Sequence, residues 1–301
     1  MTTPRRYATP LAFKTALEQR LRTLSRGRMD LTRRRQLVVF ERLLARMSRH
    51  VGGAMILKGG LALELRLEHA RATKDIDLRL AGPSDDLMHQ LQTAGQMTLG
   101  DFLAFELVPD QAHPKIQSEG MRYEGLRFRA QCSLADKIYG SPFGLDIAFA
   151  DPILGEPDEL VGGNVLEFAG VDPVRLRVYP VETHIAEKLH AYTLPRTRPN
   201  SRVKDLPDLA LLATIGGLEA ARVQAAIHQT FTFRATHPSP ASLPDPPEAW
   251  ALPYAHMATE NELPWRTLAA VTSAARDFLE PVLAGVRDSR WSPARWAWHG
   301  S

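Results

Sequence analysis

Two short segments carry residues whose types and spacing could do chemistry. The first is Lys58-Gly59-Gly60, a glycine turn preceded by a lysine, and the second places Asp75 and Asp77 two residues apart. Side chains two positions apart on a strand project from the same face, so both carboxylates would point the same way. Carboxylate oxygens suit Mg²⁺ and a glycine turn can receive phosphate. The two segments together predict a nucleoside triphosphate as the ligand.

The elements around these residues decide whether they can act together. Residues 54–57 are typical of a short buried strand, and residues 61–67 of a helix that begins just past the glycines. A phosphate would then meet a helix N-terminus, where free N–H groups and the helix dipole favour an anion. Taken singly, the glycine pair also fits an ordinary tight turn, and Asp-x-Asp a solvated strand edge. Their order and spacing favour the phosphate and metal interpretation.

The composition is that of a globular protein. Its 301 residues are 44% hydrophobic, enough to bury a large core as one domain or two lobes. No apolar stretch reaches the roughly 20 residues that span a bilayer, and the N-terminus lacks the apolar run of a secretory signal. We therefore expect a cytoplasmic protein that does not enter a membrane. The one cysteine, Cys132, excludes an internal disulfide and a thiolate metal cluster.

Positive charge is concentrated near the N-terminus. Residues 1–50 contain thirteen Lys or Arg and three acids, although the whole chain carries a net charge of only +3. Arginine is well shaped to bind phosphate, so this segment could face a polyanion such as RNA. The same charges could equally form a solvated, arginine-rich helical face.

Hydrophobic periodicity predicts helices at the N-terminus and a sheet after them. Apolar residues spaced by three and four indicate helices over 11–24 and 32–49, with Arg42, Arg46 and Arg49 outside the apolar stripe of the second. After residue 180 the pattern becomes helical, including 206–215 and 268–283, and a proline-rich linker or strap interrupts it over 237–253. Strands are expected over 54–57, 75–80, 102–108, 126–134, 145–149, 165–168 and 176–178.

These elements predict a mixed α/β fold in three parts. Residues 1–53 would form a basic helical segment packed on the core, residues 54–180 the core itself, and residues 181–301 a mostly helical C-terminal lobe.

Asp146 is a third candidate metal ligand. It lies inside the apolar segment 144–149, where a charge is costly unless it is paired or binds metal. A salt bridge to Arg127 or Arg129 is the alternative. Asp151, at the end of the same segment, is a weaker candidate.

Three charged residues of the helical region could complete the site. Lys188 lies on a predicted helix beside the small Ala191, where its ammonium group could reach a triphosphate, although it could also be an ordinary exposed lysine. Asp205 and Asp208 fit the start of a helix, Asp205 as N-cap with Pro207 in the first turn. Capping alone would explain both aspartates.

The ordered series of these motifs resembles a known family. It runs Lys58-Gly59-Gly60, Arg71-x-Thr73-x-Asp75-Ile76-Asp77, Asp146, Glu187-Lys188-Leu189-x-Ala191 and Arg202-x-Lys204-Asp205-x-x-Asp208-Leu209. The series is similar to that of the nucleotidyltransferase toxins of the AbiEii/AbiGii type, which include the mycobacterial MenT toxins. The resemblance covers about residues 54–215, and the order of the motifs is more specific than any one of them.

The resemblance implies a fold, an activity and partners. The fold would be a DNA polymerase β-like nucleotidyltransferase core, a mixed sheet flanked by helices, with a helical C-terminal lobe. The activity would be transfer of a nucleoside monophosphate from an NTP, dependent on Mg²⁺ or Mn²⁺, to an RNA acceptor such as the 3′ end of tRNA. A cognate antitoxin is implied as protein partner, and we expect a monomer.

The resemblance also assigns residues by position. Asp75, Asp77 and Asp146 would bind metal and act in catalysis together with Lys188 and Asp205, while the nucleotide would be bound by Lys58, Gly59, Gly60, Arg71, Thr73 and Asp208. Two residues depart from the family pattern. Leu61 stands where Thr or Ser commonly follows the glycines, which removes a hydroxyl contact, and Lys74 places a charge inside the metal motif.

Two other functions stay open at this point. The same chemistry could modify a small molecule or a protein side chain, or the chain could be a non-catalytic protein that binds RNA or a partner on a transferase scaffold. The ten histidines are scattered without a recognisable ligand spacing, which disfavours a phosphodiesterase with metal-binding histidines.

Overall fold

The computed structural model describes residues 6–25, 30–67, 70–82, 86–116, 125–149, 151–196 and 202–300. The α-helices in these ranges are α1 (Pro10–Leu24), α2 (Leu31–Val51), α3 (Gly59–Arg66), α4 (Leu87–Gln96), α5 (Val181–Thr193), α6 (Asp205–Leu212), α7 (Ala220–Arg234), α8 (Ala251–Glu260) and α9 (Leu268–Leu283). Short 3₁₀ helices are η1 (Gly52–Ala54), η2 (Glu167–Ala169) and η3 (Glu248–Trp250). In the described part of the chain, every helix is too short or too polar to cross a lipid bilayer.

The strands form one large sheet and a separate hairpin. They are β1 (Ile56–Lys58), β2 (Ile76–Leu80), β3 (Ala104–Pro109), β4 (Lys115–Ile116), β5 (Gly125–Leu134), β6 (Lys137–Ile138), β7 (Phe143–Phe149), β8 (Asp158–Val161), β9 (Arg175–Val178), β10 (Ser289–Ser292) and β11 (Ala297–Gly300). The large sheet has the order β3-β5-β7-β2-β1-β9-β8, with β4 and β6 also paired to β5. Because β2 is parallel to β7 and antiparallel to β1, the predicted mixed sheet is confirmed.

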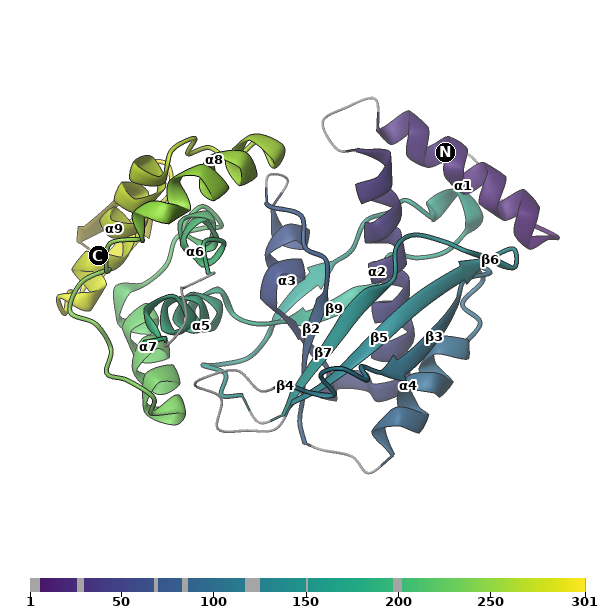
Figure 1. Ribbon diagram of the computed structural model, residues 1–301, viewed down its shortest axis with the longest axis horizontal. Helices are drawn as coiled ribbons and strands as arrows, with labels where there is room; N and C mark the ends of the chain where they lie inside the picture. Colours follow the sequence, from purple (N-terminus) through teal and green to yellow (C-terminus); the bar gives the residue numbers. More distant parts are fainter. Residues whose placement is uncertain are drawn as a thin grey trace.

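Two hydrophobic clusters underlie the two ends of the molecule. The first joins α1, α2, α4 and the sheet and contains buried residues from Phe13 to Val178. The second joins the C-terminal helices and contains Leu63 together with buried residues from Val181 to Trp291. Figure 1 shows α1, α2 and α4 on the side of the sheet away from this helical lobe, and α3 between the two. The boundary expected near residue 180 falls between the clusters, and the division into domains stays a proposal.

Two arginines that were expected outside the apolar stripe of the second helix are buried. Arg46 is fully buried and Arg42 nearly so, and both guanidinium groups donate to the carboxylate of Asp101. The distance from Arg46 Nη2 to Asp101 Oδ1 is 2.5 Å. A position outside the apolar stripe does not keep them at the surface, because a distant segment supplies the counter-charge that lets both cations enter the core.

Three predicted elements also differ in kind or extent. Residues 165–168, expected to be a strand, form a turn that leads into η2. The helix after the glycine turn begins at Gly59 itself. The proline-rich strap ends at residue 247, because Pro253 lies in the first turn of α8, where a missing N–H breaks no intrahelical hydrogen bond.

Candidate active site

One row of charged side chains crosses four neighbouring strands. In the strand register, Lys58 on β1 faces Asp77 on β2, and Asp77 faces Asp146 on β7. Asp146 in turn faces Arg127 on β5. Residues that face one another on adjacent strands lie on the same side of a sheet. The row therefore places two like carboxylates side by side, with a cation at each end.

Glycines are required at positions 59 and 60 because other side chains lie very close to the backbone there. Gly59 has a φ of 68°, in the left-handed region, and a Cβ there would lie 2.6 Å from Cγ of Asp77. A Cβ on Gly60 would lie 2.9 Å from Oγ1 of Thr73. Any larger residue would push these side chains away. The glycines thus let the start of α3 lie directly against Asp77 and Thr73.

Hydrogen bonds fix the segment that leads into β2. Asp75 lies one residue before the strand, and its Oδ1 accepts the N–H of Gly144 at 3.1 Å. The N–H of Thr73 donates to Glu64, and the guanidinium of Arg33 donates to the carbonyl oxygen of Thr73 at 2.6 Å. Asp75 is therefore held at the edge of β7, one residue from the first position of β2.

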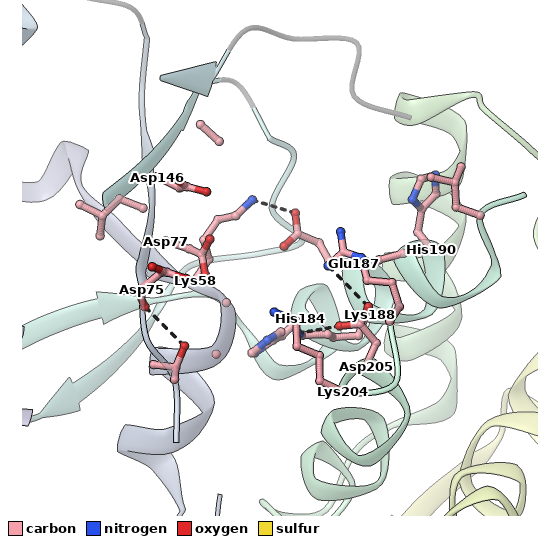
Figure 2. Close-up of a pocket in the computed structure, with 18 of the residues that line it drawn as sticks. Lys58, Asp75, Asp77, Asp146, His184, Glu187, Lys188, His190, Lys204 and Asp205 are labelled. Carbon is pink, nitrogen blue, oxygen red and sulfur yellow. Dashed lines mark hydrogen bonds and ion pairs between the residues drawn. The ribbon is translucent and has the colours of Figure 1, made fainter. Parts of the chain in front are cut away.

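A cavity of about 310 Å³ lies between the sheet and the C-terminal helices. Figure 2 shows Asp75, Asp77 and Asp146 on its sheet side and Lys188, Lys204 and Asp205 on its helical side. The structure brings ten of the eleven predicted site residues to its lining: Lys58, Gly59, Gly60, Arg71, Thr73, Asp75, Asp77, Asp146, Lys188 and Asp205. Eight Lys or Arg line it against five Asp or Glu, so the cavity is suited to a polyanion.

The remaining predicted residue, Asp208, acts behind the lining. It is fully buried, and its two oxygens accept both nitrogens of the Arg71 fork at 2.8 Å each. Lys188 lies 2.7 Å from Asp208 and 3.0 Å from Asp205. Asp208 therefore holds Arg71 and Lys188 in place, and a direct contact with nucleotide stays a prediction.

The charges of this cluster stay ionised in the folded protein. Burial opposes a charge on Lys188, but Asp208 and Asp205 outweigh it, and the pKa of Lys188 is raised. Burial likewise opposes ionisation of Asp208, but Lys188 and Arg71 outweigh it, and the pKa of Asp208 is lowered. Asp205 begins α6 and is not its N-cap, since Lys204 occupies that position. The capping interpretation of Asp205 is wrong because its carboxylate turns to Lys188.

Lys58 links the sheet to the helical lobe. Its ammonium group contacts Asp151, and it donates to Glu187 on α5 at 3.1 Å, a bond drawn in Figure 2. Arg234 on α7 donates to the same Glu187 oxygen at 2.6 Å. Asp151 is fully buried between these cations, so it serves as their counter-charge and does not line the cavity.

His184 is a lining residue that the sequence did not assign to the site. It is almost fully buried in the first turn of α5, and its Nε2 has no hydrogen-bond partner among the described residues. Burial, followed by the charge of Lys188, lowers the pKa of His184 to about 3, so the imidazole is neutral. The other charged or imidazole lining residues left unassigned are Arg127, Glu187, His190, Arg196, Arg202, Lys204 and Arg234.

Some of these unassigned lining residues could have been found from the sequence. His184, Glu187, Lys188 and Ala191 recur at helical spacing, so the site role predicted for Lys188 could have been extended to the other residues of that helix face. Arg234 has no such signal, because it comes from a different helix.

The two departures from the family pattern lie away from the cavity. Leu61 is fully buried in the hydrophobic cluster under the sheet, and Lys74 is exposed. Neither side chain lines the cavity.

The carboxylates of the cavity fit a divalent cation in donor type. Burial, followed by the neighbouring charge of Asp146, raises the pKa of Asp77, as expected for two carboxylates side by side. Carboxylate oxygens of this kind suit Mg²⁺ or Mn²⁺. Within the described ranges, no three Asp, Glu, His or Cys side chains converge as a metal-binding group. The donors fit in type, but Asp146 is turned to Arg127, with distances of 2.7 and 2.6 Å.

Comparison with known proteins gives the family of this mixed α/β protein with a charged cavity. The sequence model of the AbiEii family, described as the nucleotidyl transferase AbiEii toxin of a type IV toxin–antitoxin system, matches residues 42–278. This chain belongs to the AbiEii family of nucleotidyltransferase toxins. The resemblance inferred from the ordered motifs is therefore confirmed.

The solved structure of MenT4 has the same fold. MenT4, a nucleotidyltransferase toxin from Mycobacterium tuberculosis, is similar with a TM-score of 0.60 and 15% sequence identity over 93% of this chain and 92% of that chain. JHP933 from Helicobacter pylori is similar with a TM-score of 0.42 and 15% identity over 81% and 94% of the two chains. None of the proteins with curated descriptions matches this chain in sequence.

Proposed function

We propose that this toxin transfers a nucleoside monophosphate from an NTP to an RNA acceptor, the 3′ end of tRNA, in a reaction that depends on Mg²⁺ or Mn²⁺. The modified tRNA would no longer support translation. The toxin would therefore act in the cytoplasm. Family membership supports a nucleotidyltransferase with a cognate antitoxin. The acceptor, the metal and a monomeric state are part of the proposal.

The observation that carries the proposal is the division of charge in the cavity. The three aspartates stand on the sheet side, and most of the cations that line the cavity, including Lys188 and Lys204, lie on the helical side with Glu187 and Asp205, across a space of about 310 Å³. A triphosphate with a bound divalent cation has the complementary arrangement, because its metal faces carboxylates and its outer phosphates face ammonium groups. Phosphoryl transfer depends mainly on such positioning and charge stabilisation.

The residues of the chain take separate roles in this reaction. Asp75, Asp77 and Asp146 would hold the metal, which when bound neutralises phosphate charge and activates the attacking hydroxyl. Lys188, kept protonated by Asp205 and Asp208, binds the outer phosphates. In this position it would hold the leaving pyrophosphate opposite the carboxylates.

Lys204 adds a second cation for phosphate on the helical side. It lines the cavity and makes no ion pair with any residue in the described ranges. Burial, followed by the charges of Arg71 and Lys188, lowers the pKa of Lys204, so a bound phosphate would favour its protonated form. The neutral His184 adds a hydrogen-bonding group without further charge.

The RNA backbone is best placed near the start of α6. Arg202 and Lys204 line the cavity there, Arg196 lines it just after the end of α5, and such cations bind phosphates without reading sequence. The N-terminal helices contribute less than their composition suggests. Four of their cations pair inside the protein, with Glu64, Glu18 and Asp101, and α1 lies on the side of the sheet away from the helical lobe (Figure 1).

The test is incubation of the purified protein with each α-labelled NTP, total tRNA and Mg²⁺. Label on tRNA is expected with the wild-type protein and should disappear with Asp77→Asn. Glu106→Gln is the matched control, because Glu106 is an exposed acid of β3 in the same sheet, outside the cavity lining.

Each outcome discriminates between functions. Label on protein or on a small molecule would replace RNA by another acceptor. An absence of transfer with every NTP would favour a non-catalytic binding protein, and equal transfer by Asp77→Asn would contradict the proposed site.

A further inference from the structure

The pairing of Asp146 with Arg127 uses both oxygens of a carboxylate that the proposed metal site needs. Arg127 Nε lies 2.7 Å from Oδ1, and Nη2 lies 2.6 Å from Oδ2. The two residues face each other directly in the register of β5 and β7. Parallel two-point contacts of this kind are the strongest geometry for an arginine and a carboxylate. The lone pairs of Asp146 that accept these two bonds cannot bind a cation while the contact lasts.

This arginine differs from the arginines that stabilise the core. The Arg127 side chain is 38% exposed at the cavity, whereas the side chain of Arg46 is fully buried and that of Arg71, which also lines the cavity, is only 9% exposed. A guanidinium at the cavity surface can leave its partner and be hydrated, but a buried one cannot do so without a large desolvation cost. The Arg127 contact is therefore the exchangeable one.

The position of Arg127 also accounts for the state of the three acids. Asp77 faces Asp146, and Asp75 is held next to β7, yet no three donors converge in the described part of the chain. Of the three acids, Asp146 is the one whose two oxygens both contact an arginine, Arg127. Release of this single contact would free the third carboxylate for the other two.

We propose that Arg127 is an internal competitor of the divalent cation, which occupies Asp146 until the metal displaces it. The inference rests on the proposed function, since it assumes a metal at these carboxylates. The competition has two physical parts, because a metal must break the Arg127 contact and must also enter beside a positive charge. Removing the guanidinium is expected to tighten metal binding about tenfold, because it removes both a partly exposed ion pair and a like-charge repulsion.

The experiment measures metal binding directly on the full chain. Mn²⁺ is titrated into the wild-type protein and into Arg127→Gln, and free Mn²⁺ is followed by its electron paramagnetic resonance signal. Arg129→Gln is the matched control, because Arg129 lies two residues along the same strand, is 64% exposed and only approaches Asp110 at 3.9 Å. Asp77→Asn serves as the variant that should lose the site.

The expected result is a dissociation constant about tenfold lower for Arg127→Gln and unchanged for Arg129→Gln. Equal affinities of Arg127→Gln and wild type, with Asp77→Asn defective, would overturn the competitor role and leave the metal site intact. Absence of saturable binding in every variant would overturn the metal site as well. The two failures are therefore distinguishable.

Thermal unfolding supplies an independent readout. In EDTA, Arg127→Gln should unfold at a lower temperature than wild type, because Asp146 loses its counter-charge. Added Mn²⁺ should raise the melting temperature of the variant more than that of the wild type. An equal rise in both proteins would contradict the proposal.

Discussion

Replacement of Asp77 by asparagine should stabilise the metal-free protein while abolishing its activity. Asparagine keeps the shape of the side chain and removes its charge, which stands beside Asp146 in the register of β2 and β7. Adjacent strands are about 4.8 Å apart. Two unit charges about 5 Å apart repel by about 3 kcal/mol at an effective dielectric constant of about 20.

The flanking cations reduce this repulsion. Arg127 neutralises much of the charge of Asp146, and Lys58, the cation that favours ionised Asp77 most strongly, offsets part of the remainder. Against them stands the burial that also raises the pKa of Asp77. We therefore expect Asp77→Asn to raise the free energy of unfolding by about 1–2 kcal/mol in the absence of metal.

Urea unfolding at pH 7.5 provides the assay, first in EDTA and then in Mg²⁺. A metal that binds only the folded state stabilises it by about 2.7 kcal/mol at a hundred times its dissociation constant. The wild type should gain this stability, whereas Asp77→Asn should not. The order of stability of the two proteins is thus expected to reverse between EDTA and saturating Mg²⁺.

Two results would refute this reasoning. A loss of stability in EDTA would show that Asp77 makes favourable interactions in the metal-free protein. An equal effect of Mg²⁺ on both proteins would show that the metal binds elsewhere. Glu106→Gln, on an exposed position of the same sheet, should behave as the wild type under both conditions.

Three further changes have definite expected outcomes. Burial raises the pKa of Glu41 to about 7, above the unfolded value of about 4.3, so the charge of Glu41 costs stability at pH 8 and not below pH 4. In urea unfolding, Glu41→Gln should therefore stabilise the protein by about 1–3 kcal/mol at pH 8, and this gain should shrink toward pH 4.5. A difference that does not depend on pH would contradict this. Gly59→Ala should cost at least about 1–2 kcal/mol and reduce transfer because it displaces Asp77, whereas Gly82→Ala, where a Cβ meets nothing within 4 Å, should be neutral in both assays. Asp101→Asn should destabilise by about 3–5 kcal/mol in thermal unfolding, since two buried arginines of α2 lose their partner, while transfer per folded molecule stays unchanged; a mild effect would mean that these cations are hydrated.

Elements with a strong local pattern could be predicted from the sequence. The helix expected over 268–283 is α9 (Leu268–Leu283), and the strand expected over 126–134 differs from β5 by one residue. Both have a hydrophobic period that matches one type of secondary structure along their whole length. Residues 165–168 lack such a length, and there the expected strand is a turn and a 3₁₀ helix.

The sequence by itself determined the chemistry available to this protein. The order of its glycines, aspartates and lysines indicated a nucleotidyltransferase toxin, and the family match confirms it. The same motifs indicated residues that the fold then gathers around one cavity. A motif can do this because the spacing of side chains along a strand or helix is a local property.

Only the tertiary structure decided which charge neutralises which. Asp146 is held by Arg127, Lys188 by Asp205 and Asp208, and two arginines of α2 by Asp101. Several of these partners are far apart in the sequence, and a charge can enter the interior only where the fold brings an opposite charge to it. Sequence periodicity indicates on which face of a helix or strand a side chain lies. Which charge lies opposite that face depends on strand order and helix packing alone.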